Sequence, residues 1–201
     1  MFENYVEADV TSTERDDLPV TALLPGSLVE PIVIYDSLTA LRMAVVERAG
    51  AHLLGSEWDI PGDYILLDPV DGDGNYGAYV GQAPAGLRSR LGSHLRSKDH
   101  WRRALLITKD TTFGFHSAHA GWLEGRLWQL LNDAEHAELH NGNRPKDETL
   151  PPYERTALEA CARPSAGSCA SSAAASTARA RTGRHRPAGD TTPTLASPSP
   201  S

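Results

Sequence analysis

Sequence that can build a hydrophobic core stops abruptly near residue 160. From Cys161 to Ser201, 28 of the 41 residues are Ala, Ser, Pro or Thr, none is aromatic, and Leu195 is the only larger aliphatic residue. Such a segment buries too little apolar surface to offset the entropy that it would lose on ordering. We therefore expect residues 161–201 to form a disordered tail, and the fold must be built from residues 1–160.

The residues just before this tail predict the start of a helix within 146–160. Tyr153, Ala157 and Leu158 lie near one helical face of the stretch YERTALEA, at the spacing of an amphipathic helix. A natural linker would end globular sequence in this way. A shifted reading frame in a GC-rich gene would do the same, because it yields mainly Ala, Arg, Pro, Ser and Thr.

Charge is distributed unevenly along the chain. The net charge is -7, but residues 1–160 hold 14 basic and 25 acidic residues, and the first 80 residues hold 3 and 15. Between positions 88 and 103 the balance inverts, because one acid, Asp99, stands among six cations: Arg88, Arg90, Arg96, Lys98, Arg102 and Arg103. A local basic segment can bind a polyanion whatever the net charge of the protein. The alternative is a solvated helix face.

Several protein classes are excluded. No apolar run reaches the ~18 to 20 residues of a membrane-spanning helix, and the start, MFENYVEADV, lacks the basic and then apolar layout of a secretory signal,. We therefore expect a cytoplasmic protein with no membrane partner. Cys161 and Cys169 are the only cysteines, so neither a disulfide framework nor a four-cysteine zinc site can form.

Hydrophobic periodicity and turn residues predict the elements. Ser37 is expected to cap the first helix. The expected strands are 31–35, 64–67, 77–81 and 104–108, the expected turn is 71–75, and the expected helices are 38–49, 87–95 and 122–131. From residue 64 onward the order predicts an α+β fold, with a small three-stranded, mostly antiparallel sheet flanked by helices.

Metal sites with histidine ligands are only weakly indicated. His116 and His119 are three apart, and His136 and His140 are four apart on an expected helix, a spacing that can place two imidazoles on one metal. No third ligand accompanies either pair, so solvated histidines are the alternative. The stretch DGDGN at 71–75 lacks the glutamate of a calcium loop and is interpreted as a hairpin turn,.

Another set of polar residues fits phosphodiester hydrolysis. That reaction needs a group to activate water, a cation to neutralise the phosphate, and usually a divalent metal for the leaving oxygen. Tyr64 and Tyr79 lie on adjacent expected strands, and Arg90 lies on the helix that follows them. Glu124 stands one position from the apolar stripe of the helix 122–131, where a half-buried carboxylate could hold Mg²⁺.

The order of these motifs resembles that of a GIY-YIG nuclease domain. The two half-motifs are Gly62-Asp63-Tyr64 and Tyr79-Val80-Gly81, and Arg90-Leu91 with His94 one turn later resembles the family's arginine helix. Trp122-Leu123-Glu124 resembles its metal motif, and Asn141 its terminal asparagine, with Asn143 as the substitute. Each motif is unspecific alone, but the five occur in the family's order on elements of the expected type.

The resemblance implies a role for each matched position. Tyr64 and Tyr79 would flank the nucleophilic water, with either one as the general base. Arg90 would bind the scissile phosphate, His94 would assist proton transfer, and Glu124 would be the sole protein carboxylate on Mg²⁺ or Mn²⁺. Asn141, Gly62 and Gly81 would be structural. The basic segment would supply the substrate-binding residues Arg88, Arg96, Lys98, Arg102 and Arg103.

Three departures from the family pattern are visible. Asp63 replaces an apolar residue, the loop between the half-motifs is longer than is common, and Gln82 stands where some relatives have lysine.

The domain organisation implied is an acidic N-terminal extension with a strand and a helix (1–60), the nuclease-like domain (61–145), the start of a helix (146–160) and the tail (161–201).

The predicted function is a metal-dependent endonuclease that hydrolyses DNA, with RNA not excluded. The first alternative is a catalytically inactive nucleic-acid-binding module on the same scaffold. The second is a structural or regulatory partner that uses the acidic first 80 residues as its surface. Specificity, pathway and oligomeric state are not contained in the pattern.

Overall fold

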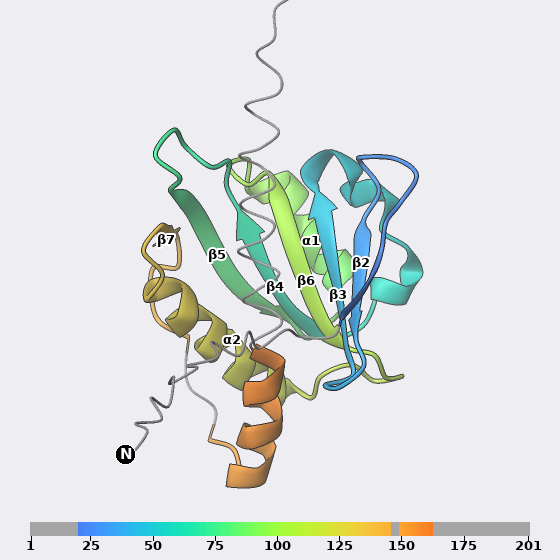
Figure 1. Ribbon diagram of the computed structural model, residues 1–201, viewed down its shortest axis with the longest axis vertical. Coiled ribbons are helices and arrows are strands. Elements are labelled where there is room, and N and C mark those ends of the chain that lie inside the picture. Colours follow the sequence, from blue (N-terminus) through green and yellow to red (C-terminus); the bar gives the residue numbers. More distant parts are fainter. Residues whose placement is uncertain (1–19, 146–148, 163–201) are drawn as a thin grey trace, which may run out of the picture.

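The computed structural model describes residues 20–145 and 149–162 (Figure 1). Its sheet has seven strands in the order β1-β2-β3-β6-β4-β5-β7. All neighbouring strands are antiparallel except β5 and β7, which are parallel. The strands are β1 (Val20–Leu23), β2 (Ile32–Asp36), β3 (Leu41–Glu47), β4 (Gly62–Leu67), β5 (Tyr76–Ala83), β6 (Arg103–Lys109) and β7 (Ala137–Leu139). The prediction of a small three-stranded sheet is therefore wrong.

The three strands that were expected after residue 60 lie side by side within the larger sheet. They are β4, β5 and β6, with β4 in the middle. The sheet is larger than expected because β3 pairs with the edge of β6 that does not face β4. This pairing covers seven positions, from Leu41 opposite Lys109 to Glu47 opposite Arg103. The strands of residues 20–47 therefore continue the sheet formed by β4, β5 and β6. The tail expected at 163–201 lies outside the described residues.

The helix expected at 38–49 is also wrong, because β3 occupies its middle. Alternating positions of β3 enter two different cores: Leu41 and Met43 pack on one face of the sheet, and Ala44 and Val46 on the other. A strand covered on both faces has a nearly continuous apolar run, which periodicity alone does not separate from a helix. Asp36, not Ser37, organises the preceding turn, since its carboxylate accepts hydrogen bonds from Leu38 N (2.9 Å) and Thr39 Oγ1 (2.5 Å).

Helices cover both faces of the sheet (Figure 1). On one face, α1 (Leu87–Ser97) and the short 3-10 helices η1 (Arg48–Leu53) and η2 (Ser56–Trp58) lie over a core that includes Tyr64 and Trp101. On the other, α2 (Ser117–Asn132) packs against Ile65 and Val80. A helix at 152–162 contributes Leu158 and Cys161 to this second core, so Cys161 and Ala162 are ordered although they were expected in the tail.

Two local predictions around the β4–β5 hairpin have opposite outcomes. The turn at 71–75 is confirmed, because Asp71 Oδ1 accepts the backbone N–H groups of Asp73 (2.9 Å) and Asn75 (2.8 Å). The helix expected for His136 and His140 is wrong, since β7 lies between them and pairs with residues 76–78 of β5.

Among the described residues no helix has the length and apolarity to cross a membrane.

Candidate active site

The two tyrosines lie on neighbouring strands and point to the face that α1 covers. Tyr64 of β4 pairs with Gly81 of β5, and Tyr79 pairs with Leu66. The two phenol rings are stacked, with 6.3 Å between their centroids. A Cβ at position 81 would collide with the Tyr64 hydroxyl. Gly81 therefore provides the space into which the Tyr64 hydroxyl reaches.

Helix α1 brings a guanidinium and an imidazole to the same hydroxyl. Arg90 Nε donates to Tyr64 Oη at 3.2 Å, and His94 Nε2 lies 2.7 Å from that oxygen. Arg90 and His94 are four residues apart, so they share one face of the helix. Tyr64 itself is only 2% exposed, and burial raises the pKa of its phenol to about 12. At neutral pH the Tyr64 hydroxyl is consequently protonated.

His94 is neutral under the same conditions. Its burial, followed by the charges of Arg90 and Lys98, lowers the pKa of the imidazole to about 4. Its Nδ1 is buried and has no hydrogen-bond partner within the described part of the chain. A neutral imidazole next to a protonated phenol can accept a hydrogen bond from it through Nε2,.

Glu124 reaches this region from α2, on the other side of the sheet. Its carboxylate is half-buried, and Oε2 accepts a hydrogen bond from Gln82 Nε2 at 3.1 Å. Burial raises the pKa of Glu124, while the Gln82 hydrogen bonds and the Arg90 charge oppose that rise. Glu124 also acts electrostatically on Tyr64 and Arg90. A cation bound to Glu124 would offset the cost of burying this charge.

Asp63 carries a second carboxyl group, which interacts electrostatically with Glu124. Its side chain is 0% exposed, and neither oxygen has a hydrogen-bond partner in the described residues. Burial and the Glu124 charge raise the pKa of Asp63 well above its ordinary value. Asp63 therefore keeps its proton in the folded chain at pH values where the unfolded chain has lost it.

Replacing Asp63 by Val is expected to stabilise the fold at pH 7 by ~1 to 3 kcal/mol, because a buried polar group without partners is removed. The gain should grow with pH. Above pH ~4 the unfolded state ionises while the folded state does not, so wild-type stability falls by up to ~1.4 kcal/mol per pH unit until the raised pKa is reached. Urea unfolding of Asp63→Val and wild type at pH 4 and pH 7 measures this. Equal stability of the two proteins at both pH values would contradict it.

Asn141 holds the edge of β5 beside Tyr79. Its Oδ1 accepts Val80 N (2.9 Å) and its Nδ2 donates to Val80 O (2.8 Å). The side-chain amide thus continues the pairing of β5 beyond β7. Asn143, the substitute in the sequence pattern, is exposed. Gly62 allows β4 to approach β6, because a Cβ there would collide with Ile107 O.

Asn141→Ala is expected to lower the free energy of unfolding by ~1 to 3 kcal/mol, because both backbone groups of Val80 lose their partner. Asn143→Ala is the matched control and should change it by less than ~0.5 kcal/mol, as an exposed substitution does. Chemical denaturation of the two variants measures the difference. Equal effects would show that Asn141 does not hold this edge.

The basic residues predicted to bind substrate are divided between different surroundings. Lys98 Nζ lies 3.9 Å from the centroid of the Tyr79 ring. Arg88 forms an exposed ion pair with Asp59 at 3.0 Å, and exposed Arg96 contacts Ser93 Oγ. Arg102 and the buried Arg103 both pair with Glu47 of β3. The structure thus brings Lys98 to the tyrosines and places Arg103 in the protein interior.

Of the two histidine pairs suggested by spacing, His116 and His119 lie side by side, with 5.6 Å between their ring centroids, whereas His136 and His140 have different partners. His119 contacts Glu154 at 3.0 Å, with His116 beside its ring, and His136 contacts Asn75. His140 instead meets His100 and Asp68 in a cluster of three potential metal ligands. Asp68 is 32 positions from His100 and 72 from His140, and no local pattern connects them.

Comparisons of this chain with protein-family models, with curated proteins and with solved structures find no match.

Proposed function

We propose that the chain is a metal-dependent endonuclease of the GIY-YIG type, which hydrolyses phosphodiester bonds of DNA. The observation that carries the proposal is the convergence on the Tyr64 hydroxyl. Arg90 and His94 both contact it, Tyr79 stacks beside it, and Glu124 is coupled to it electrostatically. These residues come from β4, β5, α1 and α2, and are the ones for which the family resemblance implies chemistry.

Glu124 is the residue that would hold Mg²⁺ or Mn²⁺. A half-buried carboxylate is a hard oxygen donor of the kind these ions take, often with few other protein ligands,. When bound, the ion would stabilise the negative charge that develops on the leaving oxygen. Arg90, which is exposed on α1, would bind the phosphate and stabilise its transition-state charge through its forked guanidinium,.

The burial of the two tyrosines divides their roles. Tyr79 is partly exposed, so its hydroxyl is assigned to orient the attacking water. The ammonium of Lys98 lies over the face of the Tyr79 ring, at 3.9 Å from its centroid, as a cation attracted by an aromatic ring does,. Buried, protonated Tyr64 can donate a hydrogen bond to Nε2 of neutral His94 over their 2.7 Å contact, while its oxygen accepts from Arg90 Nε. Lys98, Arg96 and Arg88 would contact the DNA backbone, as their positions along and after α1 permit.

A nicking assay on supercoiled plasmid tests the proposal. Full-length protein is expected to cleave with Mg²⁺ or Mn²⁺ and to stop cleaving when EDTA is added. Single-stranded, duplex and branched DNA, with RNA as a further substrate, would define the preferred nucleic acid. Absence of cleavage on every substrate with both metals would refute the nuclease.

A non-catalytic nucleic-acid-binding module is the second candidate. It is favoured by the hydrogen bond from Gln82 to Glu124, because this amide contacts the carboxylate on which the metal would bind. In that case the protein would bind DNA with an affinity that falls steeply with salt, without cleavage. Binding and nicking measured on one preparation separate the two functions.

A further inference from the structure

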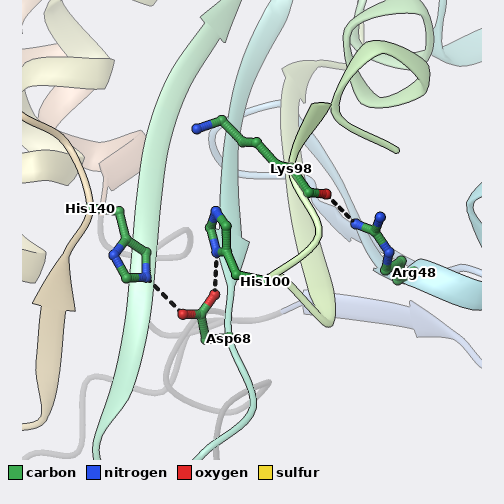
Figure 2. Close-up of polar contacts among 5 residues, drawn as sticks. All are labelled: Arg48, Asp68, Lys98, His100 and His140. Atoms are coloured by element: carbon green, nitrogen blue, oxygen red, sulfur yellow. Dashed lines mark hydrogen bonds and ion pairs between the residues drawn. The ribbon is translucent and has the colours of Figure 1, made fainter. Parts of the chain in front are cut away.

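Asp68, His100 and His140 form a second polar centre, shown in Figure 2. Asp68 Oδ1 lies 2.7 Å from His100 Nδ1, and Asp68 Oδ2 lies 2.7 Å from His140 Nε2. The potential ligand atoms of the three residues all lie within 4.8 Å of one another. Two imidazoles and one carboxylate at this separation can reach one metal ion with little movement.

The backbone around this centre is fixed at three points. Asp68 N donates to Gly77 O (2.9 Å), His140 N donates to Ala78 O (2.8 Å), and Arg102 N donates to Leu67 O (2.8 Å). These bonds hold the end of β4, the residue after β7 and the α1–β6 connection against one another. The ligand residues therefore come from three separate segments that are already in place before any ion binds.

Arg48 adds a support on the side of His100. Its guanidinium donates to the carbonyls of Lys98 (2.7 Å) and Leu95 (3.1 Å), and the contact with Lys98 appears in Figure 2. The guanidinium also lies 4.7 Å from the centroid of the Trp101 ring. Arg48 thus contacts both Lys98 and Trp101, the residues on either side of 99–100. These contacts restrict the position of the His100 imidazole.

Gly77 keeps the centre open. A Cβ at this position would collide with His140 Nε2 and with the Asp68 carboxylate. The two histidines are each 36% exposed and Asp68 is 19% exposed, so water can reach the centre. The arrangement offers three protein ligands and access for a fourth ligand from solvent.

We propose that Asp68, His100 and His140 bind a zinc-type transition metal ion, separate from the Mg²⁺ assigned to Glu124. Imidazole nitrogen favours Zn²⁺ and its neighbours in the transition series, whereas Mg²⁺ prefers an all-oxygen set. Binding requires that His100 Nδ1 and His140 Nε2 carry no proton, so each ring keeps its proton on the opposite nitrogen, His100 Nε2 or His140 Nδ1. The lone pairs of His100 Nδ1 and His140 Nε2 then face the ion, and a solvent water completes four-coordination.

The ion would connect two segments that reach the candidate active site. His140 directly precedes Asn141, which holds the edge of β5, and His100 follows Lys98, which lies over Tyr79. A metal that ties His100 and His140 to Asp68 would therefore hold the Tyr79 side of the site together. This role is structural and does not depend on whether the protein is a nuclease.

Calorimetric titration of EDTA-treated, full-length protein with Zn²⁺ tests the site. We expect one ion per chain, with retention in a large excess of Mg²⁺, and weakening by about 100-fold or more in His100→Gln and Asp68→Asn. The matched control, His52→Gln, removes an exposed histidine from η1 and should bind as the wild type does.

Co²⁺ absorption of the wild-type protein gives a readout that needs no variant. A visible spectrum typical of four-coordinate nitrogen and oxygen ligation is expected, and Zn²⁺ should remove it. Failure of the wild type to bind Zn²⁺, a six-coordinate Co²⁺ spectrum, or unchanged affinity in folded His100→Gln would each overturn the proposal. Plasmid nicking is scored separately, so failure of the nuclease proposal leaves this result interpretable.

Discussion

Glu124→Gln is expected to lower Mg²⁺-dependent cleavage by ~10³-fold or more, because the amide cannot replace the anionic ligand of the metal. The substitution keeps the size of the side chain and retains an oxygen that can accept the hydrogen bond from Gln82. Folding should therefore be preserved, and circular dichroism with a urea melt would establish this. The rate is measured as plasmid nicking under single-turnover conditions.

Glu138→Gln is the matched control for Glu124, since it removes one carboxylate from an exposed position on β7. Its cleavage rate should equal that of the wild type. Full activity in purified Glu124→Gln, or an equal loss in Glu138→Gln, would show that Glu124 does not hold the catalytic metal. If Glu124→Gln loses both activity and folding, Glu124→Ala is the second variant to be tested for folding and cleavage. It removes the acceptor of the Gln82 hydrogen bond as well as the charge.

Arg90→Lys should lower the cleavage rate by ~10² to 10³-fold, although the positive charge is kept. Lysine lacks the planar fork that binds two phosphate oxygens, and it cannot reproduce the Nε contact with Tyr64. If Arg90 acts in the transition state, the loss appears in kcat with little change in DNA affinity. Single-turnover cleavage and equilibrium DNA binding on the same variant measure the two quantities.

Arg126→Lys is the control for Arg90, because Arg126 lies on α2 in a partly exposed ion pair with Glu159 and is not among the residues assigned to DNA binding. Exposed pairs of this kind contribute little to stability, and the control should cleave at close to the wild-type rate. A drop in DNA affinity alone for Arg90→Lys would reassign Arg90 to binding. Equal losses in both variants would indicate a general effect of replacing arginine by lysine, not a role of Arg90 in the transition state.

Local patterns predicted the elements that carry one clear periodicity. The strands expected at 64–67, 77–81 and 104–108 are β4, β5 and β6, and the helices expected at 87–95 and 122–131 lie within α1 and α2. Each of these elements has either strong β-branched and aromatic content or one apolar helical stripe. The segment 38–49 failed because its apolar run fits both periods, and pairing with the distant β6 decided in favour of the strand.

For the candidate active site, the motifs identified the residue types, but not their contacts. The order of Tyr64, Tyr79, Arg90 and Glu124 was visible, whereas the hydrogen bond from Arg90 to Tyr64 and the separation of Arg103 from the tyrosines were not. Asp63 was visible only as a departure from a pattern. Its burial and the raised pKa of its carboxyl depend on α2, which packs over this face of the sheet.

By itself, the amino-acid sequence determined which short segments could be strands, helices or turns, and which reactive side chains stand on them. Those properties depend on neighbours within about one turn of helix or a few strand positions, and this information is local. Tertiary structure alone decided that β3 joins the sheet, that Asn141 closes the edge of β5, and that Asp68, His100 and His140 meet. Each of these depends on contacts between residues far apart in the chain, whose pairing is set by the burial of both sheet faces.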